Sequence, residues 1–155
     1  MAKIYSITYQ PIDQNYGDRG NEFLRISVNE IQLIENHGIK GDAKAGRNKD
    51  RQLNLVSTEW VQSLTDKGFN TRPGQFGEQM TIRGLDVTSL PGGSRLQLGT
   101  RAIIEITKNR TGCVRLETVQ GKSLKEIEGP IGALAKVHTG GWIRVGDKVK
   151  VIQMT

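Results

Sequence analysis

The stretch GEQMTIRGLDVTSLPGGSRLQLGTRAIIEI, residues 77–106, decides the fold class. Apolar residues recur within it at a spacing of two, as the pairs Met80 and Ile82, Leu96 and Leu98, and Ile104 and Ile106. A period of two places alternate side chains on one face of a β-strand. Pro91-Gly92-Gly93 separates two of the pairs, and such clusters mark tight turns. The stretch therefore predicts several short strands joined by turns.

The same pattern extends in both directions along the chain. Alternating or apolar runs occur in KIYSITY (3–9), FLRISV (23–28), IQLIENHGIKGD (31–42), QLNLVS (52–57) and the pair Val149 and Val151. The polar segment QPIDQNYGDRGNE (10–22) is predicted to be an exposed loop. Many short strands around few helices favour a barrel or a sandwich over a βαβ sheet.

One segment has the signals of a good helix. TEWVQSLTDK (58–67) follows a candidate N-cap, Ser57, and precedes Gly68, which is placed to end the helix. Its apolar side chains share one face that we expect in the core: Trp60, Val61 and Leu64. A second, shorter helix is predicted from Ser123, because Ser123 and Glu126 have the spacing of a capping box. The expected fold is mainly β, a barrel with one principal helix and one or two short helices.

Length and composition indicate one globular domain, residues 1–155. The chain has 155 residues, 35% hydrophobic and 25% charged, with no repeat and no long linker. A domain of this size folds without a disulfide or a structural metal. The one cysteine gives no sign of an oxidising compartment. The first ten residues lack a signal peptide's apolar core and no stretch is long enough to cross a bilayer, so we expect a cytoplasmic protein without a membrane role.

The net charge of +6 favours an anionic partner. Nucleic acid, a phosphate or an anionic cofactor would each fit this charge. Aromatic residues are only 5% of the chain and do not alternate with the basic residues, which argues against RNA stacking. No Cys/His cluster has zinc spacing, so a structural zinc site is not expected.

The segment KNRTGCVRLE holds the single cysteine, Cys113, among cations. Lys108, Arg110 and Arg115 lie within five residues of it. Nearby cations favour the thiolate, which is the form that attacks or ligates a metal. The alternative is a small buried apolar side chain, which is where free cysteines usually lie.

The segment GIKGDAKAGRNKDRQLNLV (38–56) combines three glycines with basic residues, among them Lys44, Arg47 and Arg51. Flexible glycine loops let backbone N–H groups approach an anion, while basic side chains supply countercharge. The spacing matches neither a Walker A loop nor a dinucleotide fingerprint. A solvated turn with ordinary surface cations is the alternative. In RPGQFGEQMTIRG (72–84), Glu78 and Gln79 follow a Pro-Gly turn that could simply shape a hairpin.

The order of these segments resembles the MOSC family, a domain found at the C-terminus of molybdenum cofactor sulfurases and as small stand-alone proteins. The matching pieces are GIKGDAKAG (38–46), RQLNLV (51–56), RPGQFGEQ (72–79), GLDV (84–87), RLQLG (95–99), Cys113 and WIRVGDKV (142–149). No single piece is specific, but the ordered set is considerably more so. It covers the chain from about residue 23 to the end.

The resemblance implies a β-barrel with a pocket lined by the cysteine, and a role in binding molybdenum cofactor or carrying sulfur for it. Family members also carry an association with pyridoxal phosphate. In some members the cysteine ligates molybdenum and the protein reduces N-hydroxylated compounds. On this basis Cys113 is the candidate catalytic residue, metal ligand or sulfur carrier. The candidate cofactor-binding residues are Lys44, Arg47, Arg51, Gln52, Glu78, Gln79, Arg110 and Arg115.

Two residues depart from the family pattern. The first motif commonly reads G-D-x-H-A-G, and Lys44 stands in place of its histidine. The turn is often F-G-E-N, and Gln79 stands in place of its asparagine. A protonated lysine cannot accept a hydrogen bond and glutamine is one methylene longer, so both changes alter hydrogen bonding at the expected pocket.

Three functions follow as hypotheses. The first is a molybdenum cofactor-binding or sulfur-carrier domain that works with cofactor biosynthesis and sulfuration proteins or with a redox partner. As an enzyme it would be a molybdenum-dependent reductase or a sulfurtransferase, although no flavin or iron–sulfur motif is visible. The second is a basic nucleic-acid-binding β-barrel. The third is a partner domain that has kept the MOSC fold and lost the site.

Overall fold

The computed structural model describes residues 1–12 and 24–154, and its elements are mainly strands. Most of the loop predicted over residues 10–22 lies outside these residues. The strands are β1 (Lys3–Tyr9), β2 (Ile26–Val28), β3 (Glu30–Ile34), β4 (Gly38–Ile39), β5 (Leu53–Ser57), β6 (Met80–Arg83), β7 (Arg95–Leu98), β8 (Ala102–Arg110), β9 (Gly132–Thr139), β10 (Gly141–Arg144) and β11 (Val149–Gln153). The prediction of a mainly β fold is confirmed.

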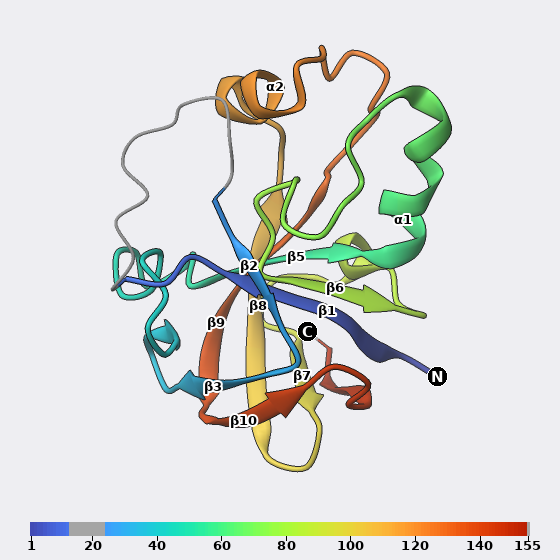
Figure 1. Ribbon diagram of the computed structural model, residues 1–155. Helices are drawn as coiled ribbons and strands as arrows, with labels where there is room; N and C mark the ends of the chain where they lie inside the picture. The colour runs from blue at the N-terminus through green and yellow to red at the C-terminus, as the bar shows by residue number, and fades with distance from the viewer. Residues whose placement is uncertain (13–23, 155) are drawn as a thin grey trace.

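Eight of the strands form one sheet in the order β11-β7-β8-β9-β5-β6-β1-β2. All neighbours are antiparallel except β5 and β6, which run parallel. The sheet curls on itself (Figure 1), and backbone hydrogen bonds join β1 to the chain entering β11. Ile4 N donates to Asp147 O at 2.9 Å, and Val149 N donates to Ala2 O at 2.9 Å. These bonds bring the two sides of the curled sheet together as a barrel.

A smaller sheet of three strands, in the order β10-β3-β4, lies at one end of the barrel (Figure 1). The main core is formed by inward-facing side chains of both sheets, including Ile4, Ile7, Leu33, Leu55 and Ile104, each at most 1% exposed. Burial alternates along β7 and along β8 from residue 102 to residue 107, as the sequence period predicted.

The principal helix begins where predicted and is shorter. Helix α1 spans Thr58–Ser63 and continues as a 3-10 turn, η1, over Thr65–Lys67. Gly68 ends this segment in the left-handed conformation at φ 85°, which glycine adopts without strain. Ser57 precedes the helix but does not cap it, because its hydroxyl donates to Leu85 O at 2.6 Å and accepts from Val87 N at 3.0 Å.

A second core cluster forms under this helix. Val61 and Leu64 are buried in it beside Phe69, Phe76 and Leu116, and the half-buried Trp60 packs against them. The Trp60 and Phe76 rings meet edge to face with centroids 5.2 Å apart. The expected apolar face of the helix is therefore a core face.

The helix predicted from Ser123 is wrong. Residues 121–130 form turns, and the second helix, α2, spans Val114–Gln120 instead. The Ser123 hydroxyl accepts from Lys125 N at 3.2 Å, which stabilises a local turn without starting a helix. The strand predicted over residues 23–28 begins later, at Ile26. No helix in the described part of the chain is long and apolar enough to cross a membrane.

Candidate functional site

Asp42 fixes the glycine-rich loop between β4 and β5. Its side chain is 3% exposed, and one carboxylate oxygen accepts from Gln10 N at 3.2 Å and Lys44 N at 3.3 Å. The other oxygen accepts from the Gln79 side-chain amide at 3.2 Å. A buried carboxylate bonded in this way is held in one position, so it sets the course of the loop that carries Lys44 and Arg47.

Glu78 and Gln79 lie in the turn before β6, and both are buried. The Glu78 carboxylate accepts from Gly74 N at 2.7 Å and Phe76 N at 3.0 Å. Burial raises the pKa of Glu78, although these backbone bonds and the charge of Arg25 oppose the rise. Gln79 links Asp42 to β5, since its carbonyl oxygen accepts from Asn54 N at 2.7 Å. Both residues are structural supports of the site as well as candidates for contact.

Arg25, which the sequence did not indicate, feels the charges of both buried carboxylates, Asp42 and Glu78. Its stem runs over Gly74, where a β-carbon would come within 3.3 Å of Arg25 Cβ and Cδ. Burial lowers the pKa of Arg25, while Asp42 and Glu78 raise it and Arg115 lowers it. Its Nη1 atom is buried and has no hydrogen-bond partner in the described chain. A buried guanidinium nitrogen without an acceptor is costly, and an anionic ligand would supply one.

Lys44 is surrounded by other cations. Burial lowers the pKa of Lys44 first, and the charges of Arg25, Arg47 and Arg115 lower it further against the opposing effect of Asp42. Arg47 itself is exposed at the surface of the loop. The lysine that replaces the family's histidine thus adds positive charge to the same place.

Arg110 connects the cations to the cysteine. It ends β8, is 8% exposed, and donates from Nη1 to the Phe76 carbonyl oxygen. Burial lowers the pKa of Arg110 to about 10, Cys113 and Glu78 raise it, and Arg25 and Arg51 lower it. The charges of these side chains therefore act on one another across the site.

We call these residues the cationic cluster: Arg25, Lys44, Arg47, Arg51, Arg110 and Arg115. The fold brings together segments that are far apart in the sequence to form it. The two carboxylates that act on it, Asp42 and Glu78, already accept backbone hydrogen bonds. Each positive side chain is held near others of the same sign, which favours an anion as the ligand.

Cys113 lies beside this cluster and is exposed. It is the residue before α2, in extended conformation, and its side chain makes no capping bond. It lines a cavity of about 350 Å³ whose other walls are largely apolar: Gly112, Val114, Glu117, Leu124, Ile127, Gly129 and Ile131. The cysteine is thus accessible, and the reading of Cys113 as a buried apolar residue is wrong.

Two further candidate residues have partners of their own. Gln52 is buried, its side-chain carbonyl oxygen accepts from Val137 N at 2.8 Å, and its amide donates to Asn36 at 3.4 Å, so its polar atoms bond to β9 and to the turn after β3. Lys108 lines a separate pocket with Asp50, Glu105 and Lys136, and the register of β8 against β9 shifts just before it, between Ile106 and Lys108. Within the described residues, no three His, Cys, Asp or Glu side chains gather as a metal site.

A family model for the MOSC domain matches residues 35–150, and the chain belongs to this family. Among solved structures it is similar to the YuaD protein of Bacillus subtilis, with 19% identity, 96% of this chain and 94% of that chain covered, and a TM-score of 0.74. It is also similar to YiiM from Geobacillus stearothermophilus, with 19% identity, coverage of 99% and 76%, and a TM-score of 0.71. YiiM from Escherichia coli gives 21% identity, coverage of 99% and 71%, and a TM-score of 0.68.

No curated protein matches the chain in sequence. The similar structures share its fold at low identity, and the family match identifies the chain as a MOSC domain. The family is known for molybdenum cofactor-binding and sulfur-carrier domains.

Proposed function

We propose that this MOSC domain binds the molybdenum cofactor, with the cationic cluster holding its phosphate and Cys113 meeting the metal or carrying sulfur for it. The observation that supports this most directly is the buried Nη1 atom of Arg25, which has no hydrogen-bond partner in the described chain. The exposed Cys113 lies close enough for its charge to act on Arg110, as the charge of Arg25 does. A soft thiolate ligand and a group of phosphate-binding cations then lie on adjoining parts of one site.

The residues present fit such a cofactor in their chemistry. Arg25 Nη1 is buried without a partner in the described chain, and an oxyanion oxygen would satisfy it. Arginine suits phosphate because its planar group donates two parallel hydrogen bonds. The exposed Cys113 sulfur is available as a ligand. When bound, the cofactor would supply a redox-active metal with sulfur ligands.

Within this proposal the protein's own groups have separate tasks. Arg25 and Lys44 would bind and orient the anion, and the exposed Arg47 and Arg51 would attract it from solution. Asp42 and Gln79 would keep the loop in position through their mutual bond. A binding or carrier role is proposed ahead of a self-sufficient enzyme, since a reductase or sulfurtransferase would also need its partner protein. A working thiol requires a reducing compartment, so the proposal includes a cytoplasmic location.

The first test is the metal content of protein purified from a host that makes the cofactor. Molybdenum is expected in the wild-type protein and is expected to be lost in Cys113→Ser, because a hydroxyl is a poor ligand for a soft metal centre. Cys113 should also react with iodoacetamide near neutral pH, and bound cofactor should protect it. Undiminished molybdenum in Cys113→Ser together with slow alkylation would contradict the role of Cys113.

The second test compares two lysines of the same loop. Lys44→Gln removes a member of the cationic cluster, whereas Lys49→Gln removes an exposed cation that is not among the charges that act on Lys44. Cofactor affinity is expected to fall only in Lys44→Gln. Equal affinity in both variants would remove the loop from the site. Salt-sensitive binding of random DNA without any cofactor would favour the nucleic-acid hypothesis instead. A protein that binds neither the cofactor nor DNA would favour the hypothesis of a partner domain.

A further inference from the structure

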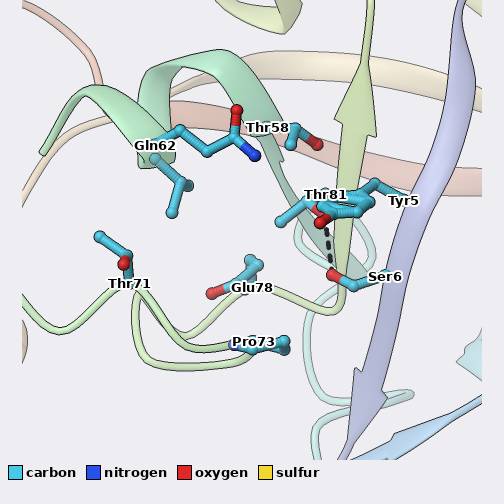
Figure 2. A pocket seen from close by; sticks show the side chains of 9 residues that line it. Tyr5, Ser6, Thr58, Gln62, Thr71, Pro73, Glu78 and Thr81 are labelled. Carbon is cyan, nitrogen blue, oxygen red and sulfur yellow. Dashed lines mark hydrogen bonds between the residues drawn. The ribbon is translucent and has the colours of Figure 1, made fainter. Parts of the chain in front are cut away.

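A second cavity, of about 430 Å³, lies between helix α1, strands β1 and β6, and the loop before β6 (Figure 2). Its walls are the side chains of Tyr5, Ser6, Thr58, Val61, Gln62, Thr71, Pro73, Glu78 and Thr81. Of these only Glu78 also borders the cationic cluster. The volume is within the range of small-molecule sites in proteins.

A β-bulge shapes one wall of this cavity. The register between β1 and β6 shifts between Ile4 and Ser6. Ile4 and Ile7 therefore both face the barrel core, while Tyr5 and Ser6, which are adjacent in the sequence, both line the cavity. Bulges redirect side chains in this way and are frequent next to functional sites.

The cavity contains hydroxyl groups with unused hydrogen-bonding capacity. Thr58 is 3% exposed, and its Oγ1 atom has no partner in the described chain. Ser6 Oγ and Thr81 Oγ1 lie 2.7 Å apart, so one proton joins them and the other is free to donate. Thr71 Oγ1 and Thr65 Oγ1 lie 3.0 Å apart, so in this pair too one hydroxyl proton is shared and the other is free to donate. These groups could both donate to and accept from a ligand.

The remaining walls are apolar or uncharged. Val61, Pro73 and the Tyr5 ring provide apolar surface, and the Arg83 guanidinium lies 4.3 Å from the centre of the Tyr5 ring and holds it in place. No lysine, arginine or histidine is among the lining residues, and the one carboxyl group is that of Glu78. This lining disfavours an anion and so differs in kind from the cationic cluster.

We propose that this cavity binds a small uncharged carboxamide with a flat apolar body. An amide offers one hydrogen-bond acceptor and two donors, and a hydroxyl group can donate to the first or accept from the others. Its apolar body fits against Tyr5, Val61 and Pro73, a surface that a polyol would use less well. Thr58 is the residue that gains most, because its buried hydroxyl acquires a partner on binding.

Nicotinamide is a suitable probe, and nicotinate is its matched anion. Titration of ¹⁵N-labelled protein with nicotinamide is expected to shift the backbone amide signals of Ser6, Thr58 and Thr81, with nicotinate binding there at least about tenfold more weakly. Thr58→Val removes the hydroxyl and keeps the shape, so nicotinamide should bind about tenfold more weakly. The control, Thr100→Val, changes an exposed turn residue and should leave binding as it was.

The Tm of the protein without ligand is an independent test. Because the Thr58 hydroxyl has no partner, Thr58→Val is expected to keep or raise the Tm without ligand. A lowered Tm would show that this hydroxyl serves the fold and would overturn the inference, as would unchanged signals at millimolar nicotinamide. If Thr58→Val does not fold, Ser6→Ala tests the same wall, and undiminished binding in it overturns the inference. Molybdenum content has no part in this test, so its outcome is separate from that of the proposed function.

Discussion

A single guanidinium, that of Arg25, determines how the candidate site would recognise an anion. Because its buried Nη1 has no partner in the described residues, a hydrogen bond to an anionic oxygen there is worth about 1.5–3 kcal/mol. Arg25→Gln should therefore weaken binding of inorganic phosphate about tenfold or more, as measured by calorimetry. The control Arg101→Gln removes an exposed arginine outside the cluster and should have no effect. Equal phosphate affinity in both variants would contradict the role given to Arg25.

The buried Glu78 carboxyl makes the free energy of unfolding fall as pH rises. Burial raises the pKa of Glu78 above its ordinary value of 4.5. The folded protein then keeps a proton that the unfolded chain has lost. This stabilising contribution is complete below the ordinary pKa and is lost as pH rises through the raised pKa.

Glu78→Gln cannot titrate, so it provides the comparison. The free energy of unfolding of the wild type should fall relative to that of Glu78→Gln as pH rises above about 4.5. The variant also loses a backbone hydrogen bond, but this offset is the same at every pH. Urea denaturation between about pH 4 and pH 7 measures the difference. Parallel curves for the two proteins would show that burial does not raise the pKa of Glu78.

At the scale of elements, the two tryptophans have opposite surroundings. Trp60 on α1 packs its edge against Phe76, whereas Trp142 on β10 is 61% exposed. Trp60→Ala is expected to cost about 3 kcal/mol of unfolding free energy, the lower end for a large aromatic because Trp60 is only half-buried. Trp142→Ala should change stability by less than about 0.5 kcal/mol. Similar losses for both, measured by denaturant unfolding, would mean that α1 does not pack as described.

Strands with one buried face were predictable, and those with two were not. The alternation in residues 3–9 predicted β1 with its observed ends, but not the bulge that places both Ile4 and Ile7 in the core. The sequence offered no alternation for β9, because residues 132–135 are all buried and carry apolar or small side chains throughout. The helix α2 was missed since only Leu116 of its residues is buried, and the capping-box spacing at Ser123 suggested the wrong position.

The site was predictable only in part for the same kind of reason. Its glycine-rich loop and its cysteine stand out in the sequence. In the structure the charge of Arg47 acts on Lys44 and that of Arg51 acts on Arg110, while the shared pocket stays a prediction. Arg25 could not be found, because its burial depends on packing over Gly74 in a distant segment. Gln52 was a candidate through the family resemblance. Its hydrogen bonds to Val137 and Asn36 form only in the folded chain, so the sequence could not indicate them.

At the scale of the whole molecule, the interpretation of the chain as one domain predicts a single unfolding transition. The second core cluster around Trp60 and the small sheet that carries Trp142 lie in different parts of the fold. Trp60→Phe leaves Trp142 as the one tryptophan, and Trp142→Phe leaves Trp60. If both regions belong to one cooperative unit, the urea midpoint measured by fluorescence should equal the midpoint measured by circular dichroism in each of the two proteins. Midpoints that differ between the probes of one protein would divide the chain into separately folding parts.

The hydrogen bonds between β1 and the chain entering β11 have a consequence for synthesis. During translation the first strand leaves the ribosome long before residues 146–149, which are its partners in the closed barrel. Until they emerge, the N-terminal half of β1 and the edge of β7 present unpaired backbone groups that other chains can join. Barrel closure must therefore wait until residues 146–149 have emerged, and a product cut short before β11 should aggregate rather than persist as a partly folded monomer.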